Sequence, residues 1–326
     1  MRTRFGLPWA LAAVLLAAGN QPSEDMGSVP AATPGAAATP GAAQRPTATS
    51  GQEPGPECNA RESLRPQGPL PDAGRMPAGS TMSRILQRGQ LIAGVDLDTY
   101  QFASRDADTG ALEGFDIDIV HNIAQAIFGD PEKVEFRQLA TDEQLRQVES
   151  GTVDLVVGTL TTTCARRDRV QFSAVYFEAG QRVLVNQGSA VGSLADLSDQ
   201  RVCASRGSTS LQKILTDPAK PVPVGAPSVT ECLVMLQLGE VDAVSTDDAL
   251  LSGLAAQDPR TRIVGPAISE EPYAVVINKT NDDLVRFVNG VLEERRTDRD
   301  GWLASYERWL RLLGPPPAPP EPQYRD

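Results

Sequence analysis

The side chains that most often carry out catalysis or bind metals are scarce in this sequence. His121 is its single histidine, so a catalytic triad or a zinc site that depends on histidine has almost nothing to use. The four cysteines include no Cys-x-x-Cys pair, the spacing typical of metal-binding motifs. We therefore expect no catalytic residue, no metal and no cofactor.

The N-terminus has the layout of a secretory signal peptide over residues 1–19. Arg2 and Arg4 supply positive charge, and a short apolar run followed by small residues comes next. The run is too short to span a membrane comfortably. Its end resembles a bacterial lipoprotein signal with Asn20 in place of the lipid-bearing cysteine. We expect export to the periplasm or cell envelope, and the sequence leaves open whether the segment is cleaved or remains as an anchor.

The cysteines are Cys58, Cys164, Cys203 and Cys232, and an even number in an exported chain is typical of disulfides. Four cysteines allow three pairings. Cys203 ends a predicted strand, and Cys232 opens a nearby predicted helix. Cys58 lies where a Pro-rich segment meets the folded part. We predict the pairs Cys203–Cys232 and Cys58–Cys164.

Composition separates a folded part from two polar ends. Residues 20–57 are rich in Pro, Ala, Gly, Thr and Ser and predict a disordered tether, and residues 313–326 predict an extended Pro-rich tail. The formal net charge of −12 argues against a nucleic-acid partner, because phosphate binding needs clustered Lys and Arg. We expect a monomer.

Strands and helices alternate between the tether and the tail, which predicts an α/β fold. Short apolar runs predict strands, and apolar residues at helical spacing predict helices. The strands are expected at residues 91–95, 153–157, 181–185, 201–204, 241–244 and 273–277, and the helices at 116–128, 228–238, 281–296 and 302–312.

A series of short motifs follows in a specific order along this part of the chain. The sequence Gly-x-Leu-x-Gly-Phe-Asp-x-Asp occupies residues 110–118, and further motifs occupy residues 151–155, 161–166, 170–176, 206–209, 239–247 and 307–309. With these motifs the chain resembles the family 3 bacterial extracellular solute-binding proteins, the amino-acid receptors of ABC importers, over roughly residues 85–312. It looks closest to actinobacterial glutamine- or aspartate-type binding lipoproteins.

The resemblance implies a periplasmic-binding-protein type II fold, in which two α/β lobes are joined by a two-strand hinge. Lobe 1 would hold residues 84–185 and 272–312, and lobe 2 would hold residues 186–271. Such proteins close around a ligand by bending at the hinge.

The resemblance also implies a site for a zwitterionic amino acid, whose charges can be buried only against charged partners. Arg166 would grip the carboxylate, and Asp247 would hold the ammonium group unless it is a solvated loop acid. Thr161 would contact the ligand through its hydroxyl. The ligand-binding residues expected in this way are Asp96, Phe102, Gly158, Thr159, Thr161, Arg166, Gly207, Ser208, Thr209 and Asp247.

Several of these assignments leave an alternative open. Gly207, Ser208 and Thr209 open a predicted helix whose N–H groups favour an anion, although Ser208 could be an ordinary N-cap. Asp96 could bind the ligand or end a strand in a turn. Phe102 could replace an aromatic residue that many relatives have at the position of Thr99, or it could pack in the core.

The expected pocket is polar, and this favours Asp, Asn, Glu or Gln as the ligand. Arg206 is a hypothetical partner for an acidic ligand side chain. The resemblance implies delivery to a membrane ABC permease. Two alternatives are a sensor domain that signals to a membrane protein and, less favoured, a cyclohexadienyl-dehydratase-like enzyme, which needs a positioned general acid or base.

Overall fold

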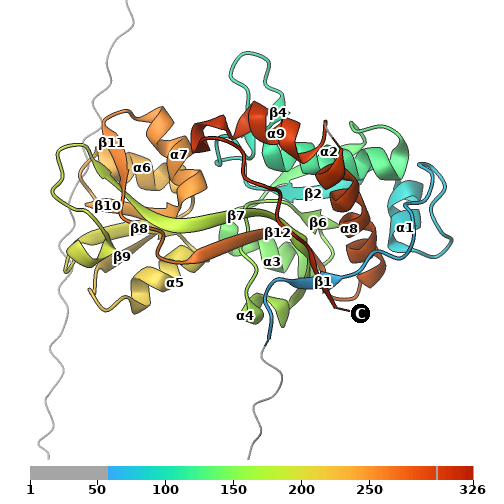
Figure 1. The fold of residues 1–326 in the computed structure, drawn as a ribbon, viewed down its shortest axis with the longest axis horizontal. Coiled ribbons are helices and arrows are strands. Elements are labelled where there is room, and N and C mark those ends of the chain that lie inside the picture. Colours follow the sequence, from blue (N-terminus) through green and yellow to red (C-terminus); the bar gives the residue numbers. More distant parts are fainter. Residues whose placement is uncertain (1–57, 299, 326) are drawn as a thin grey trace, which may run out of the picture. The chain divides into compact units, whose positions relative to one another are not determined.

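The computed structural model describes residues 58–298 and 300–325, all within the compact unit that extends from Pro56 to Asp326. The predicted signal peptide and tether, residues 1–19 and 20–57, lie outside the described residues. None of the helices in the described ranges is long and apolar enough to cross a membrane. The expected α/β architecture is confirmed (Figure 1).

Within residues 58–298 and 300–325, nine strands form one sheet in the order β5-β2-β6-β12-β7-β10-β8-β9, with β11 paired to β7. The parallel strands β2, β5 and β6 form one end of this sheet, and the parallel strands β8, β9 and β10 form the other end, with β11 beside them. We call the half of the molecule around β2, β5 and β6 the first part and the half around β8, β9, β10 and β11 the second part. The strands are β2 (Leu91–Val95), β5 (Val134–Gln138), β6 (Leu155–Val156), β7 (Val170–Asn186), β8 (Arg201–Ser205), β9 (Val222–Ala226), β10 (Ala243–Asp247), β11 (Thr261–Val264) and β12 (Glu270–Asn278).

Two long antiparallel strands, β7 and β12, connect the two parts (Figure 1). The sequence predicts only a five-residue strand at 181–185, whereas β7 continues without a break over 17 residues. Its N-terminal portion pairs with β12, and its C-terminal portion pairs with β10 and β11. A single strand therefore belongs to the first part at one end and to the second part at the other.

Helices pack against the sheet in both parts (Figure 1). The apolar residues that predict a helix at 116–128 are buried along α2, which ends at Gly129 in the left-handed conformation that glycine adopts without strain. The helices of the first part are α1 (Thr81–Arg88), α2 (Phe115–Phe128), α3 (Thr141–Glu149), α4 (Cys164–Arg167), α8 (Asp282–Thr297) and α9 (Trp302–Trp309), and those of the second part are α5 (Thr209–Thr216), α6 (Val229–Gln237) and α7 (Asp248–Gln257).

The two ends of the described chain lie side by side on the first part. β1 (Glu62–Leu64) pairs in parallel with β13 (Gln323–Arg325), a pairing that the sequence does not predict. The remaining short elements are β3 (Ser104–Arg105), which pairs with β4 (Leu112–Glu113), and the 3₁₀ turns η1 (Leu194–Asp196) and η2 (Arg311–Leu313). The C-terminal end of the chain thus contributes a strand to the fold, in addition to being extended.

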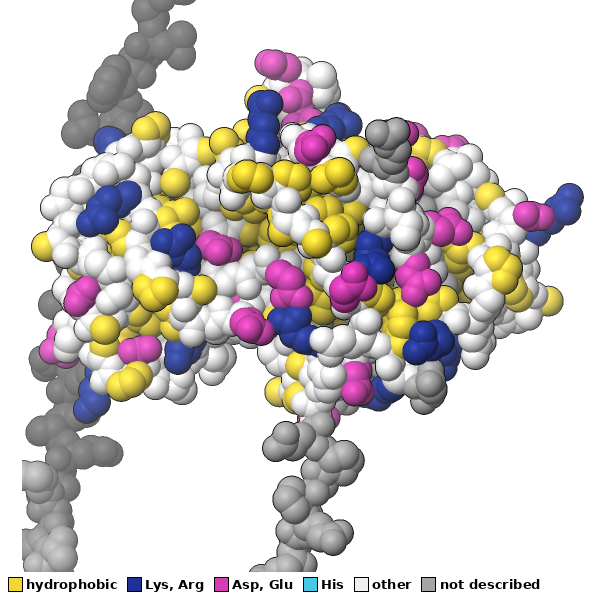
Figure 2. All heavy atoms as spheres, viewed as in Figure 1, with side chains coloured by type: hydrophobic (Ala, Val, Ile, Leu, Met, Phe, Trp, Pro, Cys, Tyr) yellow, Lys and Arg dark blue, Asp and Glu magenta, His cyan; other side chains and the backbone are white. Residues whose placement is uncertain are grey.

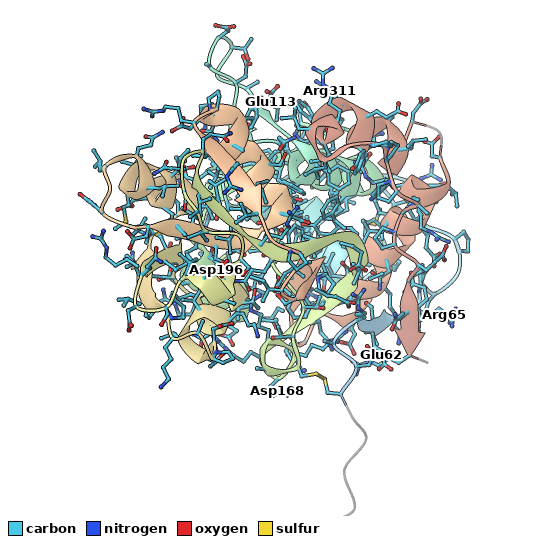
Figure 3. The ribbon with its side chains drawn as sticks, turned by 60° about the vertical axis from the view of Figure 1, so that its left-hand side comes forward. Glu62, Arg65, Glu113, Asp168, Asp196 and Arg311 are labelled. Atoms are coloured by element: carbon cyan, nitrogen blue, oxygen red, sulfur yellow. A yellow bond between two sulfur atoms is a disulfide. The ribbon has the colours of Figure 1, made fainter. Side chains whose placement is uncertain are left out.

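Two disulfides join Cys58 to Cys164 and Cys203 to Cys232, the two pairs predicted from the sequence. Cys203 lies on β8 and Cys232 on α6, so the second disulfide joins a strand to the helix packed on it. In Figure 3 the other disulfide lies close to Asp168. Its Cys58 is the residue at which the described chain begins. This disulfide fixes that end of the chain to the first residue of α4.

Candidate ligand-binding site

A cavity lies where the carboxyl ends of strands from both parts meet. Asp96 directly follows β2, Ser205 ends β8, and Asp247 ends β10. Ligands of open α/β sheets bind in the crevice at the carboxyl ends of the strands. The space that protein atoms leave here is about 380 Å³, including its opening to solvent. Figure 2 shows the surface hollowed between the two parts on the side where α4 and α5 lie.

The cavity brings together seven of the residues expected from the sequence, which come from both parts of the molecule. Among the described residues, its lining is mostly polar and contains a single cation, Arg166. The expected residues that line it are Asp96, Thr159, Thr161, Arg166, Ser208, Thr209 and Asp247, and the further lining residues are Thr99, Thr141, Leu160, Ser205, Ser210, Val229, Thr246 and Leu250.

Arg166 is positioned by the short helix α4. Thr163 caps this helix by accepting a hydrogen bond from the Arg166 N–H, and the guanidinium donates to the carbonyl oxygens of Thr161 at 2.6 Å and Gly207 at 3.0 Å. Burial lowers its pKa to about 10, against the opposing effect of Glu271 and Asp247. The side chain is therefore a cation at neutral pH, and its bond to Gly207 joins the first part to the second.

Asp247 and Asp96 provide two buried carboxyl groups in the lining of the cavity, one from each part of the molecule. Asp247 accepts from the Tyr273 hydroxyl at 2.6 Å and the Ser210 hydroxyl at 3.4 Å, and burial raises its pKa to about 8. Burial also raises the pKa of Asp96 to about 6. Within the described residues neither forms an ion pair. A ligand cation beside them would offset the cost of their burial.

Thr159 adopts a strained backbone conformation beside the cavity, with φ of 49°. This left-handed region is costly for a β-branched residue, and such strain is found most often at functional sites. Its N–H donates to Asp116 at 3.1 Å, and the Gly158 carbonyl accepts from Gln144 at 3.5 Å. The Thr159 N–H and the Gly158 carbonyl are thus hydrogen-bonded within the protein, and of these two expected residues only Thr159 lines the cavity.

Phe102 packs in the core and is absent from the cavity lining. Its ring lies edge-on to Phe177, with centroids 5.3 Å apart, and to Tyr273, at 5.9 Å. Of the two alternatives for Phe102, a ring facing the ligand or a ring packed in the core, the structure shows the second. Thr99 lines the cavity at the point where the resemblance leads one to expect an aromatic ring.

Of the glycine-containing loop before α5, Ser208 lines the cavity and Gly207 does not. Gly207 has φ of 77° and lies so close to α3 that an added Cβ would come within 2.7 Å of the Asp142 Cα. Ser208 lines the cavity and is also the N-cap, since its hydroxyl accepts from the Leu211 N–H at 3.0 Å. Arg206, the hypothetical partner of an acidic ligand, instead approaches Asp142 at 3.7 Å, outside the lining.

Glu271 is a buried group beside the cavity that sequence reasoning missed. It lies on β12 with 3% of its surface exposed. Its carboxylate accepts hydrogen bonds from the hydroxyls of Thr161 at 2.6 Å and Thr209 at 2.8 Å. The available signal was a pair of acidic residues, Glu270 and Glu271, directly before the apolar run of this strand.

Contacts between the two parts surround the cavity. The Thr230 hydroxyl on α6 donates to the Asp98 carbonyl at 3.0 Å, and Gly253 on α7 packs against Tyr100. Together with the Arg166–Gly207 bond, these contacts join the two parts beside the cavity.

The α/β architecture around one sheet, with a polar cavity at the strand ends of two parts, is shared with solved structures of the type II periplasmic amino-acid-binding fold. Residues 91–311 match the family of bacterial extracellular solute-binding proteins, family 3. The match covers more than half of the chain, and the chain belongs to this family.

Its relatives include amino-acid-binding proteins of ABC transporters. The chain is 32% identical to the ABC transporter glutamine-binding protein GlnH of Bacillus subtilis over 241 residues, 74% of this chain and 88% of the relative. It is 38% identical to a glutamine-binding protein of Geobacillus stearothermophilus over 197 residues, 60% of this chain and 75% of the relative.

Solved structures agree with this relationship. The L-cysteine receptor of Neisseria gonorrhoeae superposes with a TM-score of 0.69 at 28% identity, over 72% of this chain and 96% of the receptor. An ancestral arginine-binding protein bound to glutamine superposes with a TM-score of 0.63 at 35% identity, over 68% of this chain and 98% of that protein.

Proposed function

We propose that this chain binds a polar amino acid, from the set Asp, Asn, Glu and Gln, and delivers it to an ABC importer in the membrane. The observation that carries the proposal is the position of Arg166 and Asp247, a partly buried cation and a buried acid that line one cavity from the two parts of the molecule. An α-amino acid has the complementary pair of charges. The amino-acid receptors among the relatives support the same ligand class.

In this proposal Arg166 and the N–H groups at the start of α5 bind the ligand carboxylate. Asp247 binds the ammonium group, with Asp96 beside it. Since these groups come from two parts, a bound ligand favours the state in which the parts are closed. A micromolar dissociation constant corresponds to about −8 kcal/mol of net binding free energy.

We propose that the moving units are residues 84–185 with 272–312 and residues 186–271. β7 and β12 pass from one unit to the other and are the elements that would bend. We further propose that the chain acts outside the cytoplasm, as a monomer, and that it binds its ligand without converting it. Its membership in a family of extracellular solute-binding proteins supports this view.

A thermal-shift screen of the full chain against the twenty amino acids tests the ligand class. A ligand at a hundredfold excess over its Kd stabilises the folded state by about 2.7 kcal/mol. We expect the unfolding midpoint to rise with one or more of Asp, Asn, Glu and Gln, and Arg166→Ala to abolish the rise. No response to any amino acid would contradict the proposal.

Uptake of the labelled ligand by cells with and without the gene separates delivery from sensing. A receptor that supplies an importer is needed for uptake at low ligand concentration. We expect uptake to fall when the gene is deleted and to return with the wild-type gene. Unchanged uptake, together with binding in vitro, would contradict delivery and favour a sensor.

A further inference from the structure

Glu271 controls the direction of two hydrogen bonds at the wall of the cavity. The backbone of Thr161 pairs with Tyr273, and the N–H of Thr162 donates to the Pro272 carbonyl at 2.8 Å. This pairing places the Thr161 side chain beside Glu271, whose carboxylate accepts a hydrogen bond from the Thr161 hydroxyl with 2.6 Å between the oxygens. Thr209, the first residue of α5, donates its hydroxyl proton to the same carboxylate oxygen at 2.8 Å.

These bonds decide what the two hydroxyls can offer to a ligand. A threonine hydroxyl has one proton to donate and can otherwise only accept hydrogen bonds. The protons of Thr161 and Thr209 are both used on Glu271, and the Ser269 hydroxyl donates to its other oxygen at 2.5 Å. Thr161 and Thr209 line the cavity, so their hydroxyl oxygens can only accept hydrogen bonds from a ligand there.

The charges around the cavity favour a ligand whose side chain carries no negative charge. Asp96 and Asp247 line it, Glu271 lies directly behind its threonines, and Arg166 is the single cation among the described residues of the lining. A zwitterionic amino acid adds no net charge. A ligand with a third charged group, a side-chain carboxylate, would enter a site where acids already outnumber bases.

We propose that Glu271 is a specificity-determining residue, which makes the cavity select an amino acid whose side chain donates hydrogen bonds, a carboxamide, over the corresponding carboxylate. This inference rests on the proposed function and narrows its ligand set to Asn and Gln. The raised pKa of Asp247, to which Glu271 contributes after burial, agrees with the excess of negative charge.

Paired ligands test this inference in the wild-type protein. Gln and Glu, and likewise Asn and Asp, differ only in an amide that replaces a carboxylate, so each acid is a matched control for its amide. Titration calorimetry of the full chain is expected to show the preferred amide binding at least about 100-fold more tightly than its acid. The carboxylate of the acid has no proton to donate, so it would leave the acceptors of the site unpaired and would bring a second negative charge near the acidic residues.

The variant Glu271→Gln tests the residue itself. Its amide can donate to the threonine hydroxyls and removes the negative charge, so we expect the ratio of amide to acid affinity to fall at least about tenfold. Glu270→Gln is the matched control: the same change one residue away, at a side chain that is 84% exposed and pairs with Arg61. It is expected to leave the ratio unchanged.

The outcomes separate the inference from the proposed function. If no amino acid binds the wild-type chain, the proposed function fails. If amino acids bind but an acid binds as tightly as its amide, or if Glu271→Gln keeps the wild-type ratio, the inference alone is overturned. Should Glu271→Gln not fold, Thr209→Val removes one acceptor and is expected to lower the ratio, and an unchanged ratio would overturn the inference.

Discussion

Lowering the pH from 8 to 6 should weaken amino-acid binding, because the ligand-free cavity holds a proton on Asp247. Burial first, and then the nearby carboxylates of Glu271 and Asp248, raises the pKa of Asp247 to about 8, while hydrogen bonds from Tyr273 and Ser210 oppose the shift. A bound ammonium group favours the ionised carboxylate and lowers this pKa. The contribution of Asp247 to affinity is therefore complete above about pH 8 and is lost as the pH falls.

The size of the effect follows from the pKa. At pH 6 the ligand-free protein must release a proton held about two units more strongly than the solution pH, which costs about 2.7 kcal/mol, or about 100-fold in affinity. This is the upper limit, since water that enters an open cavity lessens the burial. Arg166, with a pKa of about 10, remains a cation across this range. Asp96, with a pKa of about 6, adds to the loss only at the acidic end.

Titration calorimetry from pH 6 to 8 with the preferred amino acid measures this effect. We expect the dissociation constant to fall by up to about tenfold for each unit of rising pH, with close to one proton released per ligand bound at pH 7. Asp247→Asn is the matched control, because it keeps the shape and removes the titration. It should bind more weakly at pH 8 and show a flat profile between pH 7 and 8. A wild-type affinity that stays constant, or increases toward pH 6, would refute the pairing of the ammonium with Asp247.

Three further predictions concern single side chains and a disulfide. Arg166→Ala should weaken ligand binding by about 2–5 kcal/mol by leaving a buried carboxylate unpaired, whereas Arg169→Ala, which removes a surface partner of Glu149, should leave calorimetric affinity unchanged. Phe102→Ala should lower the free energy of unfolding by about 3–5 kcal/mol, and Phe102→Leu should fold and bind with wild-type affinity; a selective loss of binding by the leucine variant would contradict the core position. Replacing Cys58 and Cys164 together by serine should lower the unfolding free energy in urea by about 2–4 kcal/mol, and it should weaken binding because α4 carries Arg166. An unchanged free energy of unfolding would show that the disulfide between Cys58 and Cys164 does not stabilise the fold.

Much of the fold could be predicted from local pattern. β2 coincides with the predicted strand, and α2 and α6 lie within a residue of the predicted helices. These elements carry clear periodicity and short-range caps such as Gly129. The pairing of β1 with β13 could not be predicted in this way, because it joins residues more than 250 positions apart, such as Glu62 and Gln323.

The residues of the candidate site also divide into those that the sequence predicts and those that only the structure assigns. Arg166 and Asp247 were expected because a buried amino acid needs charged partners and the motifs mark their positions, and the structure places both at one cavity. Phe102 could not be assigned from its type, since an aromatic ring serves a core and a ligand pocket equally well. Only the surrounding rings of Phe177 and Tyr273 reveal which of the two it does.

The sequence by itself determined the family, the α/β class and the residue types of the cavity, since these depend on local composition, spacing and motif order. The tertiary structure alone decided the role of Glu271. Its partners Thr161 and Thr209 are 110 and 62 residues away, and only the course of β12 between the two parts brings them to one carboxylate. The direction of a hydroxyl proton depends on which acceptor the fold places within reach, and that direction determines whether the wall of the cavity donates to a ligand or accepts from it.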